Sequence, residues 1–187
     1  RVYNLLYRIA KEHDVWLATF TAGDEKPADI DHLREICREV VTFPLAHRGA
    51  LSNPWQAVRY LFKGIPPTLR AYETREFAEK ILSLISRIDF DIIQIEDSHM
   101  AIYLDYLPDA ARSRTILTFH DVNFHKHEMM SQLEPRRARK LRTWLHARLM
   151  RGWEPYQAQH FGHCVTMSNS DKALLLAANP NLKITVL

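Results

Sequence analysis

The chain has 187 residues, 47% of them hydrophobic and 25% charged, which provides for a buried core and excludes a disordered chain. Its formal charge of +3 is too small to indicate nucleic acid binding by itself. Two cysteines give no disulfide framework and favour a reducing cytosol, and no apolar run reaches the roughly 18–20 residues of a membrane-spanning helix.

Apolar residues recur with helical and strand periods in alternating segments along the chain. In chain order these segments predict helix 2–13, strand 15–20, helix 29–38, strand 40–43, helices 54–62 and 73–88, strand 90–96, helix 98–106, strand 115–120, helix 135–159, strand 164–168, helix 170–178 and strand 184–187. Residues 21–27 and 108–113 are expected to be loops. Strands that alternate with helices imply an α/β fold, in which helices cover both faces of a parallel sheet.

Both ends of the chain look cut. Val2, Leu5, Leu6 and Ile9 already follow helical spacing with no capping residue before them, and the last residues, 184–187, form an apolar strand. We therefore expect residues 1–187 to be a single domain of a longer protein.

Polar side chains follow three of the predicted strands at their carboxyl ends. Glu96 ends one strand, with His99 shortly after it, His120 and Asp121 end the next, and Ser168 ends a third. Ligands of open α/β sheets bind at this edge. Histidine can donate a hydrogen bond to a ligand hydroxyl and changes its protonation near neutral pH, so His120 is the first candidate for chemistry.

Each of these features also has a structural interpretation. His120 can be a surface histidine at a strand end. Asp97 or Ser98 can cap the helix that follows strand 90–96, and Ser168 can cap helix 170–178. The start of helix 170–178 can equally offer backbone N–H groups to an anion.

A metal-dependent hydrolase is another interpretation, because imidazole and carboxylate groups suit zinc or iron. Its ligands would be His120, Asp121, His125 and His127. Their spacing is not one of the compact helical or hairpin ligand patterns. His125 and His127 are better explained as the head of a surface helix, so we expect no bound metal.

Residues 135–151 are densely basic. The basic residues of this segment are Arg136, Arg137, Arg139, Lys140, Arg142, Arg148 and Arg151. They do not form one clean face, because Arg137 and Arg148 fall near Leu141, Trp144 and Leu145 on a helical wheel. Such a helix can rest on an anionic membrane surface with its apolar side inserted. It can also be a solvated helix whose arginines cover apolar surface.

Several stretches together resemble the amino-terminal domain of retaining GT-B glycosyltransferases of family 4, also called group 1. They are RVYNLL at 1–6, HDVWL at 13–17, FDIIQIE at 90–96, TFHD at 118–121, WE at 153–154, VTMSNSDKALL at 165–175 and ITVL at 184–187. Each is weak alone, and their order and spacing carry the resemblance over nearly the whole chain. It is nearest to bacterial sugar transferases of cell-surface polysaccharide biosynthesis.

The resemblance implies a Rossmann-like, doubly wound parallel sheet that is one half of a GT-B fold, with the family's first strand and its Gly-rich loop missing here. In that family this half mainly holds the acceptor, and a carboxy-terminal half, absent here, binds a nucleotide-diphosphate sugar without a metal. The two halves face each other across a cleft.

By resemblance, His120 is the catalytic candidate and contacts the donor sugar or the reacting centre. The substrate-binding candidates are Arg1, Glu96, His99, Asp121 and Ser168. The expected enzyme is cytoplasmic, takes a glycan or lipid-linked acceptor, and uses no cofactor. Without the carboxy-terminal half, residues 1–187 are expected to be inactive. A nucleotide-sugar epimerase of the same fold is the alternative within this class.

Overall fold

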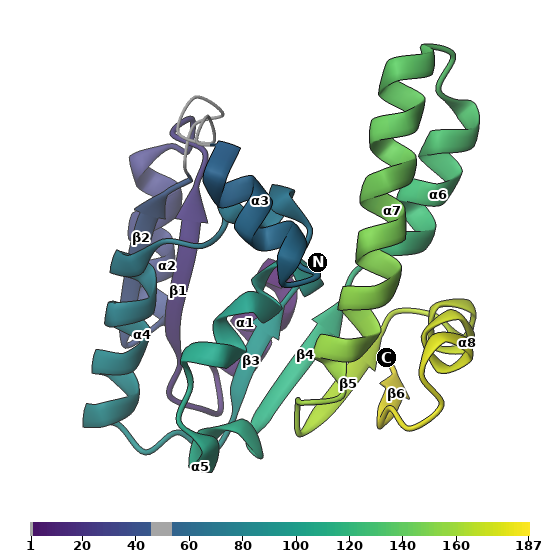
Figure 1. Ribbon diagram of the computed structural model, residues 1–187. Helices are drawn as coiled ribbons and strands as arrows, with labels where there is room; N and C mark the ends of the chain where they lie inside the picture. Colours follow the sequence, from purple (N-terminus) through teal and green to yellow (C-terminus); the bar gives the residue numbers. More distant parts are fainter. Residues whose placement is uncertain (1, 46–53) are drawn as a thin grey trace. The chain divides into compact units, whose positions relative to one another are not determined.

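The computed structural model describes residues 2–45 and 54–187 (Figure 1). Contacts between backbone positions divide the chain into two compact units, Arg1–Leu51 and Ser52–Leu187.

The first unit pairs two parallel strands with two helices. Its elements are α1 (Val2–Ile9), β1 (Trp16–Thr21), α2 (Pro27–Ile36) and β2 (Glu39–Pro44). Trp16 lies opposite Glu39, and Thr21 lies opposite Pro44. Helix α2 begins two residues earlier than predicted, because proline suits the first position of a helix, where no backbone N–H is needed.

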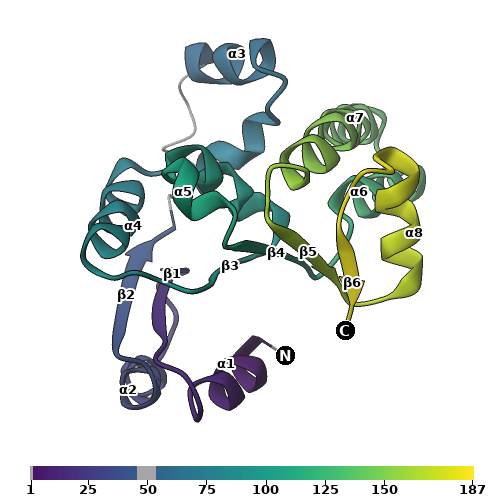
Figure 2. The same cartoon turned by 90° about the horizontal axis from the view of Figure 1, so that it is seen from below.

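The second unit holds the larger sheet. Its elements are α3 (Pro54–Phe62), the 3₁₀ helix η2 (Pro67–Ala71), α4 (Arg75–Arg87), β3 (Ile93–Glu96), the 3₁₀ helix η3 (Ser98–Tyr106), α5 (Asp109–Arg112), β4 (Thr115–Phe119), α6 (Asn123–Leu133), α7 (Arg137–Ala158), β5 (His163–Thr166), α8 (Asn169–Ala178) and β6 (Ile184–Val186). The four strands are all parallel, in the order β3-β4-β5-β6 (Figure 2). The predicted α/β class with parallel sheets and flanking helices is confirmed.

Strand β4 is one of the two inner strands of the larger sheet. Its residues Leu117 and Phe119 are fully buried, and so are Phe124 at the start of α6 and Met150 in α7. Helices α6 and α7 run side by side as a hairpin that extends past the carboxyl ends of β4 and β5 (Figure 1). Among the described residues, no helix is both long enough and apolar enough to cross a membrane.

Three local predictions were wrong. Segment 98–106 is a 3₁₀ helix, and not the expected α-helix; Ala101, Tyr103 and Leu104 are all buried, so packing on several sides replaces a single apolar stripe. The expected loop 108–113 contains the short helix α5. Strand β3 starts at Ile93, three residues later than predicted, because only its last four residues pair with β4.

Candidate functional site

His120 and Glu96 meet at the carboxyl edge of the larger sheet. Glu96 ends β3, and His120 follows the last residue of the neighbouring strand β4. The register places Glu96 opposite Thr118, so a side chain two residues further along β4 can reach back to it. His120 Nε2 lies 2.7 Å from Glu96 Oε2, and both side chains are a little under a third exposed. The two predicted residues therefore form one partly open pair.

Glu96 is itself held in place from the sheet. Gln94 Nε2 donates to Glu96 Oε1 at 2.5 Å and to Thr118 Oγ1 at 3.1 Å. Since a carboxylate can only accept, the imidazole proton in the contact with Glu96 lies on Nε2 of His120. The ring orientation is thus set by Glu96, and Nδ1 is left for another partner.

Asp97 takes up a conformation that few residues other than glycine adopt. Its φ angle is +71°, and its carboxylate caps η3 by accepting from the backbone N–H of His99 at 3.0 Å. His99 Nδ1 donates to the same oxygen at 2.6 Å, and Asn123 Nδ2 donates to it at 3.2 Å. Burial by itself raises the pKa of Asp97, but these donors outweigh burial and the net shift is downward.

Capping by Asp97, one of the structural interpretations, is therefore confirmed, and the same carboxylate orients the ring of His99. Ser168 also caps a helix: its Oγ accepts from the Asp171 N–H of α8 at 3.1 Å. Asp121 forms an exposed ion pair with Lys126 at 2.6 Å. Substrate binding by His99, Asp121 and Ser168 stays a prediction, and Arg1 lies outside the described residues.

The structure does not bring together the side chains of the metal interpretation. His120 contacts Glu96, Asp121 contacts Lys126, and His127 packs on α7. In the part of the chain that the structure describes, no group of three or more His, Cys, Asp or Glu side chains is placed to hold a metal ion. His125 and His127 do lie in the first half of helix α6, but both are half-buried.

Two histidines that sequence reasoning did not pair lie across the helical hairpin. The rings of His127 on α6 and His146 on α7 meet edge to face with centroids 4.2 Å apart. Thr68 Oγ1 lies 3.2 Å from His146 Nδ1. Burial and the nearby His127 and His99 lower the pKa of His146 to about 4, and burial likewise lowers the pKa of His127. No local signal relates these residues, which lie far apart in the sequence.

The family model that matches the chain is Glycosyltransferase Family 4, over residues 1–187. The chain belongs to glycosyltransferase family 4. Membership implies a glycosyltransferase-type domain, whose substrates are a nucleotide sugar and an acceptor. No curated protein matched the chain.

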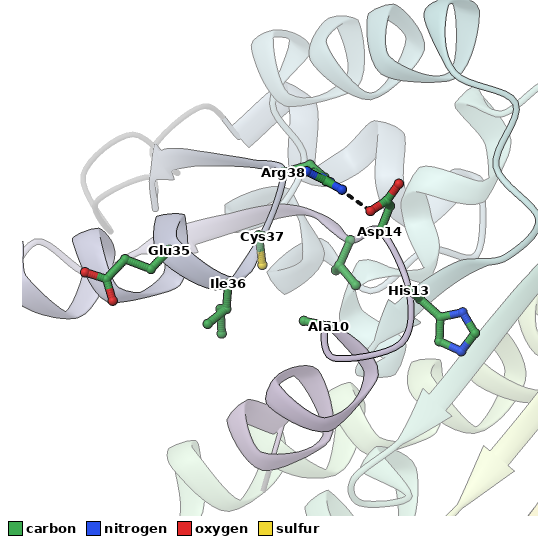
Figure 3. A pocket seen from close by; sticks show the side chains of 8 residues that line it. Ala10, His13, Asp14, Glu35, Ile36, Cys37 and Arg38 are labelled. Carbon is green, nitrogen blue, oxygen red and sulfur yellow. Dashed lines mark hydrogen bonds and ion pairs between the residues drawn. The ribbon is translucent and has the colours of Figure 1, made fainter.

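One pocket of this family 4 chain is lined by none of the candidate residues. It has a volume of about 240 Å³ and lies in the first unit, beside the amino ends of β1 and β2 (Figure 3). Asp14 and Arg38 form an ion pair of 2.8 Å at its wall, and Cys37 lies beside them. Because ligands of parallel sheets bind at the opposite, carboxyl ends of the strands, we do not assign the sugar-transfer site to this pocket.

Proposed function

We propose that the chain is the amino-terminal, acceptor-side half of a retaining GT-B glycosyltransferase. The complete enzyme would move a sugar, of the hexosyl class, from a nucleotide-diphosphate sugar to a glycan or lipid-linked acceptor. The observation that carries the proposal is the contact between His120 and Glu96 at the carboxyl edge of β3 and β4, in a chain that family 4 covers from end to end.

In the proposed reaction His120 lies at the donor sugar or the reacting centre. Glu96 holds Nε2, so a protonated imidazole can donate from Nδ1 to a sugar oxygen. A donor that is already oriented costs no reorganisation when charge develops in the transition state, and it acts most strongly in a site closed to water. Glu96 acts here as a positioning group, because its carboxylate accepts from Nε2 and fixes the orientation of the ring.

Three further binding candidates lie near the same carboxyl edge of the larger sheet. His99, Asp121 and Ser168 lie within three residues of the ends of β3, β4 and β5, and with Arg1 we propose them as contacts to the substrates. The donor's diphosphate would be held by a carboxy-terminal half of the same protein, so the mechanism needs no metal or other cofactor. The nucleotide sugar itself is the co-substrate.

The experiment that tests this function compares the complete protein with residues 1–187. The complete protein is expected to transfer sugar from a radiolabelled nucleotide-sugar panel to glycan or lipid-phosphate acceptors. Residues 1–187 alone are expected to give no turnover above background, because they lack the diphosphate clamp. Donor isomerisation without transfer would favour the epimerase alternative, and turnover by residues 1–187 would contradict the proposed division of labour.

We also propose that the enzyme is cytoplasmic and touches a membrane surface through residues 135–151. Leu141, Trp144, Leu145 and Arg148 follow helical spacing on α7, and the three apolar side chains are each about half exposed at 57%, 49% and 48%. The opposite face of α7, including Ala147 and Met150, is buried. The apolar side chains of this stripe therefore stay exposed after α6 and α7 have packed against each other.

Charge supports an anionic surface as the partner of this stripe. Within the described residues, Arg136, Arg137, Lys140 and Arg142 have no carboxylate within 4.0 Å, whereas Arg139 and Arg151 are paired with Glu134 and Glu128. Each unpaired basic group near an anionic membrane contributes about 1 kcal/mol of attraction. Trp144 suits the interface, where indole rings gather.

Replacing both Leu141 and Trp144 with serine is expected to weaken binding to vesicles at least about tenfold. Cosedimentation with phosphatidylglycerol vesicles measures the effect, and phosphatidylcholine vesicles or high salt should also reduce binding, because the attraction is electrostatic. Leu82→Ser on α4 is the matched control, since Leu82 is also exposed but lies off the hairpin. Equal binding to neutral and anionic vesicles would contradict the proposal.

A further inference from the structure

Glu154 is a carboxylate with no exposed surface, near the carboxyl end of helix α7. Its Oε1 accepts from Ser98 Oγ at 2.5 Å and from the Asn123 N–H at 3.2 Å, and its Oε2 accepts from the Phe124 N–H at 3.0 Å. Burial raises the pKa of Glu154, while these donors act in the opposite direction. A carboxyl group held at such a desolvation cost needs a structural or functional reason.

The two segments that Glu154 holds are the ones that carry the candidate pair. Ser98 follows Glu96 by two residues at the end of β3, and Asn123 follows His120 by three residues at the end of β4. A single carboxylate on α7 therefore connects the segments after both strands. Each segment is anchored within three residues of the side chain proposed for the chemistry, Glu96 or His120.

A second contact closes the network between these segments. Asn123 Nδ2 donates to Ser98 Oγ at 2.9 Å and to Asp97 Oδ1 at 3.2 Å. Because Ser98 Oγ accepts from Asn123, its own proton is directed to Glu154, and the hydrogen bonds form a chain in which each strengthens the next. No buried side-chain nitrogen or oxygen of the described residues lacks a partner, so this network is fully satisfied.

Glu154 also replaces a missing cap. The residue before α6, Val122, has no side chain that can accept a hydrogen bond, and Asn123 and Phe124 are the first residues of that helix. The helix N-terminus carries free N–H groups and a partial positive charge, which a carboxylate satisfies well. The start of α6 is thereby tied to α7, and the short connection from β4 through His120 has little freedom left.

We propose that Glu154 is a positioning residue of the sugar-transfer site: it holds the segments after β3 and β4 so that Glu96 and His120 keep their contact. The inference rests on the proposed function for its effect on turnover. Its structural part stands independently, because the hydrogen bonds to both segments exist whatever reaction the site performs. Glu154 itself touches neither His120 nor Glu96 and is not a catalytic residue.

The test uses Glu154→Gln in the complete protein, because the amide keeps the shape but presents donors where the carboxylate accepts. The kcat for sugar transfer is expected to fall at least about fivefold with KM nearly unchanged. In a His120→Ala background the same substitution should change kcat less than about twofold, since a positioning residue has nothing left to position. Ser98→Ala, which removes the link from Glu154 to the β3 segment together with the Asn123–Ser98 hydrogen bond, serves if Glu154→Gln does not fold.

The matched control is Gln157→Leu, one turn further along α7. Gln157 is also buried and polar, but its amide donates to the Ala101 carbonyl in η3 and contacts neither segment. The Gln157→Leu substitution should lower the stability of the protein without lowering kcat. A loss of kcat in Glu154→Gln that adds in full to that of His120→Ala would show a merely structural role and overturn the proposal, as would an unchanged kcat.

Hydrogen exchange separates this inference from the proposed function. Glu154→Gln is expected to speed backbone exchange in both 97–99 and 121–124, even if the complete protein transfers no sugar. Faster exchange in α7 alone would contradict the proposal that Glu154 links the two segments. If exchange becomes faster in both segments but the unchanged protein transfers no sugar, the result contradicts only the proposed function.

Discussion

His120→Ala in the complete enzyme is expected to lower turnover about 100- to 1,000-fold while the protein stays folded. This is the range lost when one oriented donor is removed from a transition-state site. The substitution takes away the imidazole that Glu96 Oε2 holds at 2.7 Å, and His120 is partly exposed, so little packing is lost with it. Initial rates of sugar transfer measure the effect, and circular dichroism checks the fold.

His160→Ala is the matched control for this experiment. His160 follows the end of α7 and precedes β5, which places it at the amino edge of the sheet, opposite His120. The same change in size and polarity there should leave turnover within about twofold. If His120→Ala behaves like His160→Ala, His120 is not part of the reacting site and the assignment of the carboxyl edge loses its main support.

The location of the candidate pair could be predicted because it depends on local patterns. Apolar runs of strand length, each ending in a polar residue, place Glu96 and His120 at chain positions that parallel pairing must bring to one edge. The Asp97 and Ser168 caps were predictable for the same reason, since a capping side chain and its helix are adjacent in the sequence. Helix 54–62 was predicted at its observed boundaries.

The contacts of Glu154, His127 and His146 could not be predicted in this way. They depend on how α6 and α7 pack as a hairpin, and on the first residue of η3, so the interacting residues lie in separate parts of the sequence. A glutamate between Trp153 and Pro155 in a helix gives only a weak signal, because its surroundings are set by tertiary packing. Tertiary packing likewise explains why residues 98–106 form a 3₁₀ helix and not the predicted α-helix.

Because packing of α6 against α7 buries His146 and His127, the stability of the protein depends on pH. The free energy of unfolding is expected to fall by about 1–2 kcal/mol between pH 6.5 and 4.5 through His146 and His127. In the unfolded chain His146 binds a proton near its ordinary value of 6.5, whereas in the folded protein its pKa is lowered to about 4. Between these values the unfolded state binds more protons, so stability is lost as the pH falls. Partial exposure of the ring to water makes this loss smaller than it would be for a fully buried imidazole.

His146→Gln isolates this contribution, because glutamine stays neutral throughout and can keep a hydrogen bond to Thr68. Urea unfolding at several pH values should give the variant a shallower loss of stability than the unchanged protein over this range. The comparison is needed because the raised pKa of Glu154 acts in the opposite direction, with protonation of its buried carboxyl favouring the folded state as the pH falls. Thr68→Val, which removes the hydroxyl but keeps the ring pair, should retain the steep slope. Equal slopes for His146→Gln and the unchanged protein would mean that the ring contact across α6 and α7 does not resist protonation.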